Sequence, residues 1–216
     1  MSDIKLNVIY IDDEEASRDV FSEVIDDLYD DKFNVVSISP NKKLADMISV
    51  IADIQDVKSI IIDEKLSVSA KTEYKGSELS EELRNIYEIM PIYILTSQPS
   101  SLEPICGSVE YVLDKGQIEQ DSYKEHVKKL LSRHIANTDA LVSEKKEKYD
   151  RLLTKSMSEG LSEVEMTELE SLELFRIKPL LKTESLVGEK DLEALDENDK
   201  ILGELEELLA SMGEKK

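Results

Sequence analysis

The chain has 216 residues and a formal net charge of −21, from 48 acidic and 27 basic side chains. The acidic excess extends over both halves, and so negative a surface repels a phosphate backbone, so autonomous DNA binding is not expected. One cysteine, Cys106, and two histidines are too few for an internal disulfide or a structural zinc site.

The sequence contains no run of 18 apolar residues, which a membrane-spanning helix would need. Its first residues, "MSDIKLNVIYIDDEE", lack the basic region and cleavage site of a secretory signal. A cytoplasmic protein without a membrane association is therefore predicted. The length favours one compact domain with a smaller appendage.

The first 120 residues alternate apolar, β-branched runs with helical patterns. Strands are predicted at 7–11, 33–38, 59–63, 91–96 and 110–114. Helical patterns lie between them at 15–29, 41–53 and 77–88. This alternation is typical of βαβ units, so the predicted fold class is α/β, with a doubly wound, five-stranded parallel sheet. Such sheets bind ligands at the carboxyl ends of their strands.

After residue 120 the strand signals stop, and an all-α extension is predicted. The domain's last helix is expected to continue to about Lys155, a length of roughly 50 Å. "SEGLSEVE" (158–165) then breaks it, with Gly160 as the stop and Ser162 and Glu165 as a capping box for the next helix. That helix should carry an apolar face and end near Pro179; the face consists of Met166, Leu169, Leu172 and Phe175. A third helix is predicted at about 191–210, with three leucines seven residues apart, a pattern too short to establish a coiled coil.

Polar residues follow the strands at the edge where ligands are expected. Asp12 and Asp13 follow the first strand, Asp63 ends the third, Thr96 ends the fourth, and Lys115 follows the fifth. In a sheet ordered 2-1-3-4-5 these four strands are neighbours, so the five side chains should share one pocket.

The chemistry of such a pocket is specific. Crowded carboxylates raise one another's pKa unless a cation joins them, and an all-oxygen ligand set suits Mg²⁺. With Mg²⁺ bound, Asp63 can act as a carboxylate nucleophile on a phosphoryl group. Thr96 and Lys115 can then bind the phosphoryl oxygens. Alternatively, Asp12 and Asp13 form a solvated turn and Asp63 caps a helix.

These residues resemble the receiver domain of the two-component response-regulator family. The resemblance covers residues 5 to about 122 and includes "KGSELSEELR" (75–84) as a glycine-led third helix. It implies a flavodoxin-like fold over 1–122 and Asp63 as the phosphoacceptor, and it leaves 123–216 as the helical extension. It also implies Mg²⁺ bound by Asp13, Asp63 and the backbone carbonyl of Lys65, with Asp12 supporting through water. The implied donor is a phosphohistidine on a sensor histidine kinase or phosphotransfer protein.

The chain departs from the family pattern at three places. Asp63 and Gly76 are 13 residues apart, which marks "SVSAKTEYK" (67–75) as an insertion beside the site. Gly116 follows the lysine where the family commonly has a cis proline. Tyr111 lies four residues before Lys115 instead of three, so strand alternation points it away from the usual side unless a bulge intervenes. Lys65 and Gln98 occupy positions through which the family tunes dephosphorylation.

Three functions remain open. The first is a signalling protein whose phosphorylation changes the protein contacts of the helical extension, with an unknown protein effector and a homodimer among the expected arrangements. The second is a phosphate sink for a kinase that serves another effector, and the third is a non-catalytic scaffold. No separate enzymatic domain is expected. His126 and His134 are interpreted as residues on or beside an amphipathic helix face, and Cys106 as a packed residue.

Overall fold

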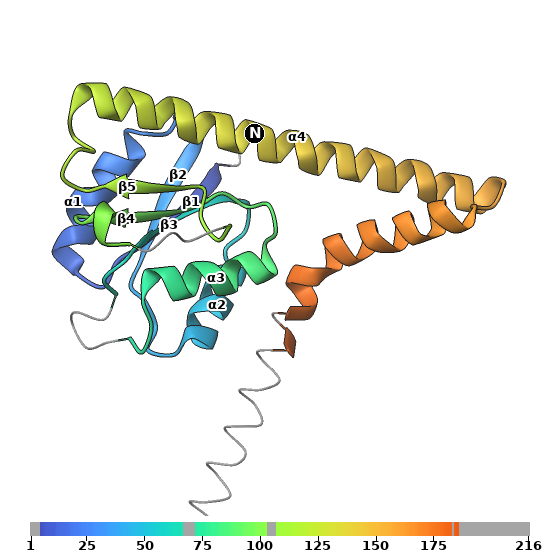
Figure 1. The fold of residues 1–216 in the computed structure, drawn as a ribbon, viewed down its shortest axis with the longest axis horizontal. Helices are drawn as coiled ribbons and strands as arrows, with labels where there is room; N and C mark the ends of the chain where they lie inside the picture. Colours follow the sequence, from blue (N-terminus) through green and yellow to red (C-terminus); the bar gives the residue numbers. More distant parts are fainter. Residues whose placement is uncertain (1–4, 67–71, 103–106, 183, 186–216) are drawn as a thin grey trace, which may run out of the picture. The chain divides into compact units, whose positions relative to one another are not determined.

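The computed structural model describes residues 5–66, 72–102, 107–182 and 184–185. They form a parallel sheet of five strands in the order β2-β1-β3-β4-β5, which confirms the predicted fold class (Figure 1). The strands are β1 (Leu6–Ile11), β2 (Phe33–Ile38), β3 (Val57–Asp63), β4 (Ile92–Thr96) and β5 (Tyr111–Asp114). Each overlaps its predicted range to within two residues at either end.

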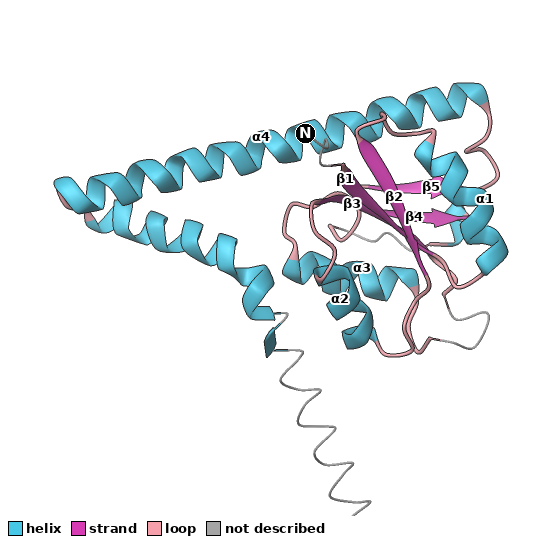
Figure 2. Ribbon diagram, turned by 180° about the vertical axis from the view of Figure 1, so that it is seen from behind, coloured by secondary structure: helices cyan, strands magenta, loops and turns pink. Residues whose placement is uncertain are grey.

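Four helices accompany this sheet: α1 (Glu15–Asp26), α2 (Leu44–Ala52), α3 (Gly76–Ile86) and α4 (Asp121–Ser158). Helices α1 and α4 cover one face of the sheet, and α2 and α3 cover the other (Figures 1 and 2). Between β4 and β5 the described residues contain one 3-10 turn, Pro99–Ser101, in place of a crossover helix. Both faces of the central strands are therefore buried, as all-parallel sheets require.

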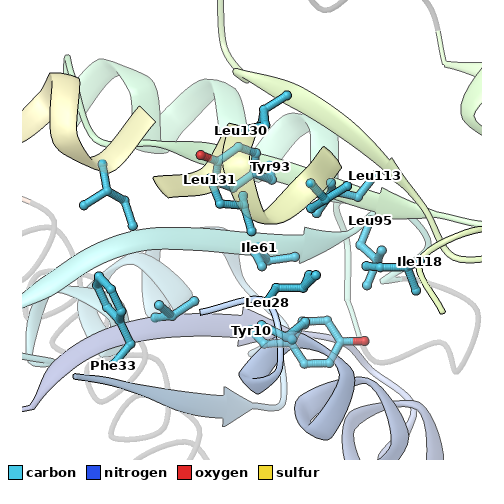
Figure 3. Packing of buried hydrophobic residues seen from close by; sticks show 14 residues of the cluster. Tyr10, Leu28, Phe33, Ile61, Tyr93, Leu95, Leu113, Ile118, Leu130 and Leu131 are labelled. Atoms are coloured by element: carbon cyan, nitrogen blue, oxygen red, sulfur yellow. The ribbon is translucent and has the colours of Figure 1, made fainter. Parts of the chain in front are cut away.

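Alternate residues of the strands build the two halves of the core. Val8, Ile61 and Leu95 face α1 and α4, where Leu28 and Leu131 pack against them (Figure 3). Their neighbours in sequence, such as Ile9, Ile60 and Ile94, face the other way and have no exposed surface. Each such side chain stabilises the fold by roughly 1.5–3 kcal/mol. This core fixes the register of the strands, and thereby the positions of their carboxyl ends.

Helix α4 belongs to two parts of the structure. Its first half packs on the sheet through Val127, Leu131 and Ile135. The helix then continues without interruption to Ser158, three residues past its predicted end. Gly160 has a φ of +81°, the left-handed region in which glycine carries little steric cost.

A second helix in the extension begins at 163 and runs to 182, past its predicted end near Pro179. The predicted capping box is present: Ser162 Oγ accepts the backbone N–H of Glu165 at 3.4 Å, and the Glu165 carboxylate accepts the backbone N–H of Ser162 at 3.0 Å. Of its predicted apolar face, Leu172 is buried, whereas Met166 is 50% exposed.

The chain separates into two compact units, Met1–Pro179 and Leu180–Lys216. The helix predicted at about 191–210 lies outside the described residues. In the part of the chain that is described, no helix is both long and apolar enough to cross a membrane.

Candidate functional site

Three carboxylates meet at the carboxyl edge of the sheet. Asp12 and Asp13 follow β1, and Asp63 is the last residue of β3; each has a carboxylate oxygen within 4.8 Å of one from each of the others. They meet because Ile11 pairs with Ile62 in the β1–β3 register, which sets the next residue of each strand side by side. All three are buried, with exposures of 1%, 2% and 6% in chain order.

The ammonium group of Lys115 joins two of these acids. Its Nζ lies 2.8 Å from Oδ2 of Asp12 and 2.7 Å from Oδ1 of Asp63. The backbone N–H of Lys115 donates to the carbonyl of Thr96 at 2.9 Å, which anchors the residue beyond the end of β5. The same ammonium lies 4.9 Å from the centre of the Phe21 ring, so an aromatic side chain also covers it.

Burial and charge act against each other in this pocket. Burial raises the pKa of Asp63, and the hydrogen bond and charge of Lys115 offset part of that rise. For Lys115, burial alone would lower the pKa, but its hydrogen bonds to Asp12 and Asp63 outweigh burial and raise it. Three buried acids beside one ammonium leave an excess of negative charge, and a hard divalent cation fits such an oxygen-lined cluster.

Asp12 is held by three groups that the sequence analysis did not identify. The hydroxyl of Tyr10 donates to its Oδ2 at 2.7 Å, and the backbone N–H of Glu14 donates to its Oδ1 at 2.9 Å. Arg18, on α1, donates to the Asp12 backbone carbonyl at 2.7 Å. Burial, followed by the bond to Asp12, raises the pKa of Tyr10, so this hydroxyl remains a donor. The carboxylate is therefore fixed in one orientation.

The residues after Asp63 are locked onto the start of α3. The Lys65 N–H donates to Oδ2 of Asp63 at 2.6 Å, and the Glu64 carboxylate accepts both the N–H and the hydroxyl of Ser77, at 2.9 and 3.0 Å. Gly76 lies so close that a Cβ there would be 2.2 Å from the Asp63 carbonyl oxygen. Only glycine permits this approach. The carbonyl of Lys65 as a metal ligand stays a prediction.

A pocket of about 340 Å³ opens beside the acids. Its lining includes all three acids, together with Glu14, Ser17, Phe21, Lys65, Ser97 and Lys115. Thr96 is not part of this lining: it is 2% exposed, and its hydroxyl accepts the backbone N–H of Gln98 at 3.2 Å. The neighbouring Ser97 is the hydroxyl residue that borders the pocket.

Tyr111 and Thr96 lie on opposite faces of the sheet. The pairing of β4 with β5 is regular, with Tyr111 opposite Tyr93 and Asp114 opposite Thr96. No bulge reverses the alternation, so Tyr111 packs with Tyr93 against the core beneath α4. A direct contact between the Thr96 and Tyr111 side chains is therefore excluded in this arrangement.

The other two departures have local structural reasons. The N–H of Gly116 donates to Oδ1 of Asp114 at 2.8 Å, a bond that proline could not make. In the described part of the insertion, the Tyr74 hydroxyl donates to the Asn41 carbonyl at 2.8 Å, and the Glu73 N–H donates to that of Lys42 at 3.2 Å. The end of the insertion is thus attached to the loop after β2.

Of His126, His134 and Cys106, which the sequence analysis interpreted as structural, the two histidines lie in the described part of the chain. His134 stacks on Tyr93, with the ring planes 4° apart, and the Tyr93 hydroxyl lies 3.1 Å from its Nδ1. His126 is exposed on α4. Cys106 lies outside the described residues.

Response regulators and their receiver domains are among the solved structures that the chain resembles in fold. The response regulator TrrA from Thermotoga maritima, in complex with Mg²⁺ and BeF, is 19% identical, with a TM-score of 0.43 over 58% of this chain and 98% of that one. A CheY-like receiver domain from Methanospirillum hungatei is 13% identical, with a TM-score of 0.45 over 62% of this chain and 98% of that one. The receiver domain of NtrX from Brucella abortus is 13% identical, with a TM-score of 0.44 over 60% and 98%. No family model and no curated protein sequence matches the chain.

The fold found in the structure is thus the one predicted from the sequence. The resemblance covers about 60% of the chain, and among the described residues α4 and the helix that begins at 163 continue beyond it. At these identities and TM-scores, the argument for a function has to come from the site itself.

Proposed function

We propose that the protein is a response-regulator-like signalling protein that accepts a phosphoryl group on Asp63. One observation carries the proposal: the Lys115 ammonium contacts both Asp12 and Asp63 within a buried cluster of three acids. A structural ion pair needs one acid for one base, and burying surplus carboxylates destabilises a fold. A phosphoryl-transfer site, by contrast, needs a nucleophile, a cation, and acids for a metal in one place.

The chain's residues have distinct roles in this reaction. A carboxylate oxygen of Asp63 attacks the phosphorus of a phosphohistidine, the P–N bond breaks, and the imidazole leaves with the bonding electrons. Lys115 then pairs with the new phosphoryl oxygens in addition to Asp12, and so neutralises charge that develops during transfer. The Lys65 N–H orients the Asp63 carboxylate before the attack. Thr96 reaches the phosphoryl group after its hydroxyl turns from Gln98, or Ser97 takes this role.

The donor set fits Mg²⁺ as the cofactor. Asp13 and Asp63, with the Lys65 carbonyl, would bind it, and Asp12 would support it through water. Bound there, Mg²⁺ would neutralise carboxylate and phosphoryl charge. The deep, oxygen-lined position of the three acids supports this assignment.

Phosphorylation would act on partners through the helical extension. The expected donor is a sensor histidine kinase or a phosphotransfer protein, and the expected output is a change in protein contacts rather than DNA binding. Helix α4 connects the phosphoacceptor domain to the extension without a break. A two-state rearrangement of the domain could therefore be transmitted directly. A phosphate sink requires the same site but no such change.

Incubation with a small acyl phosphate and Mg²⁺, followed by intact-mass measurement, tests the proposal. One phosphoryl group should be gained, and treatment with hydroxylamine, which cleaves acyl phosphates, should remove it. Asp63→Asn should abolish the gain, whereas Asp19→Asn, at an exposed acid of α1, should not. If no phosphoryl group is gained, or if Asp63→Asn gains as much as the wild type, phosphoryl transfer to Asp63 is refuted. The non-catalytic scaffold is then the remaining function. A change in partner binding on phosphorylation separates the switch from the sink.

A further inference from the structure

Exposed apolar side chains gather in one part of the molecule. We define the hairpin as residues 140–158 of α4 and residues 163–178 of the helix that follows. Among described residues up to 179, nine large apolar side chains are exposed, and seven of them lie in the hairpin: Leu141, Val142, Leu153, Met157, Val164, Met166 and Leu174. The rest of this unit exposes two, Val20 and Val50. A surface so concentrated in apolar groups is typical of an interface.

The hairpin has too little interior to account for its own stability. Of its residues, Leu152 and Leu172 are buried. The two helices are otherwise joined by polar contacts: ion pairs of Lys148 with Glu168 and of Lys155 with Glu165, and a stacking contact of Lys145 on Phe175. Exposed ion pairs contribute little, and a helix pair needs an apolar face buried against something.

Four of these seven exposed side chains, Val142, Leu153, Met157 and Met166, share one flank of the hairpin. On α4, Val142, Tyr149, Leu153 and Met157 are spaced seven, four and four residues apart, which places them on one face. On the second helix, Met166, Leu169 and Arg176 likewise share a face, at spacings of three and seven. Arg176 lies 4.2 Å over the Tyr149 ring, so the two faces adjoin. We call Val142, Tyr149, Leu153, Met157, Met166 and Leu169 the apolar flank.

The two helices that form this flank carry opposite net charge. Residues 140–158 hold five bases and three acids, whereas residues 163–178 hold five acids and two bases. Two of these charges lie on the flank and have no ion-pair partner among the described residues: Lys146, four residues after Val142, and Glu173, seven residues after Met166. They remain available to another molecule.

This division of charge selects the occupant of the flank. An acidic partner would be attracted to α4 but repelled by the second helix, and a basic partner would experience the reverse. A second copy of this chain, turned by a two-fold axis, places each basic helix over the partner's acidic helix. The face is about 28 Å long and about 20 Å wide for two packed helices, which approaches the area of a standard interface.

We propose that the apolar flank is a homodimer interface in which two hairpins pack into a four-helix bundle. The pairing goes beyond the proposed phosphoryl transfer and does not depend on it, so it should form equally in Asp63→Asn. It buries the flank against its copy and pairs the unmatched charges across the two-fold axis. Each protomer thereby supplies the hairpin core that the other lacks.

Charge reversal tests the geometry in the full-length chain. One variant carries Lys146→Glu, so both of these flank charges are acidic; the other carries Glu173→Lys, so both are basic. In sedimentation equilibrium at physiological salt, each variant alone should show a dimer dissociation constant raised at least about tenfold. An equimolar mixture should recover dimers, because each acidic flank then meets a basic one. A mixture that stays monomeric while the wild type dimerises would overturn the pairing.

Removing the apolar contact provides the second test. Leu153→Glu with Met157→Glu should weaken the dimer on the order of a hundredfold, since charges would be buried in the interface. Val50→Glu, at an exposed apolar residue of α2, is the matched control and should dimerise as the wild type does. Glutamate is a good helix former, and circular dichroism verifies that the helices persist. A monomeric wild type, or a dimer unaffected by the flank substitutions, would overturn the proposal.

Discussion

The Tyr10 hydroxyl and the Lys115 ammonium share one oxygen of Asp12, at 2.7 and 2.8 Å. Tyr10 has no exposed surface, so its hydroxyl reaches the site from within the core. A carboxylate with two donors on one oxygen is restrained in rotation. Asp12 therefore holds Lys115 at a fixed distance from Asp63.

Removing that hydroxyl should weaken the fold and loosen Lys115. Tyr10→Phe is expected to lower the free energy of unfolding by roughly 2 kcal/mol, the range for a buried hydrogen bond to a charged group. Urea unfolding measures it. Tyr87→Phe is the control, because no hydrogen bond of its hydroxyl is found among the described residues, and it should change stability by less than about 0.5 kcal/mol. Equal effects of the two substitutions would contradict this role of Tyr10.

Gly76→Ala should be far more disruptive than an ordinary glycine substitution. The added Cβ would lie 2.2 Å from the Asp63 carbonyl oxygen, so β3 and α3 must separate. The free energy of unfolding is expected to fall by about 3 kcal/mol, and phosphorylation by an acyl phosphate should be slower. Gly116→Ala, whose Cβ would meet a flexible Asp114 carboxylate oxygen at 3.3 Å, should cost less than about 1 kcal/mol. If both variants unfold at the same urea concentration, the close approach does not matter for stability.

Mg²⁺ should stabilise the folded protein through the three acids. At ten times its dissociation constant, a ligand that binds the native state alone adds about 1.4 kcal/mol to the free energy of unfolding. Thermal unfolding with and without Mg²⁺ reports this difference. Asp13→Asn should remove most of it, and Asp19→Asn should leave it unchanged. A response to Mg²⁺ that survives in Asp13→Asn would place the metal elsewhere.

His134 should make stability depend on pH. Burial lowers the pKa of His134 from its ordinary value of 6.5. The unfolded chain therefore binds more protons than the folded protein just below pH 6.5, so the free energy of unfolding falls as the solution is acidified through this range and is fully restored above it. Urea titrations at several pH values measure the slope. His134→Gln should flatten it, and an unchanged slope would exclude His134 as its source.

The site acids could be predicted because each ends a strand. A carboxylate at the end of "IIID" or "VIYIDD" stands out against a buried run, and the strand order then brings Asp12, Asp13 and Asp63 together. Tyr10 could not be predicted as a site residue, because within an apolar strand its ring indicates only burial. The contact between Glu64 and Ser77 spans 13 residues across an insertion, so local spacing gives no sign of it.

In the helical extension, too, local motifs could be predicted from the sequence and contacts between distant residues could not. The capping box of Ser162 and Glu165 lies within one turn and is visible as a motif. The pairing of Lys148 with Glu168 depends on where the turn falls, and single charges along a helix do not encode that. The spacing of Met166, Leu169, Leu172 and Phe175 predicts an apolar face but not how much of it is buried, because a helix beside a single neighbour buries only a narrow stripe.

Because α4 runs without a break from the sheet into the hairpin, the orientation of the hairpin depends on the number of helical residues between them. Asp139, whose Oδ1 accepts a hydrogen bond from the Lys58 ammonium at 2.7 Å, is the last residue of the helix before the hairpin. One residue inserted after it would rotate everything beyond by about 100° and advance it by about 1.5 Å. Seven inserted residues would nearly restore the original angle, at the cost of about 10 Å of length. The number of residues between the sheet and the hairpin therefore sets the direction in which the hairpin points. A single inserted residue changes that direction, whereas an insertion close to whole helical turns changes only the distance of the hairpin from the sheet.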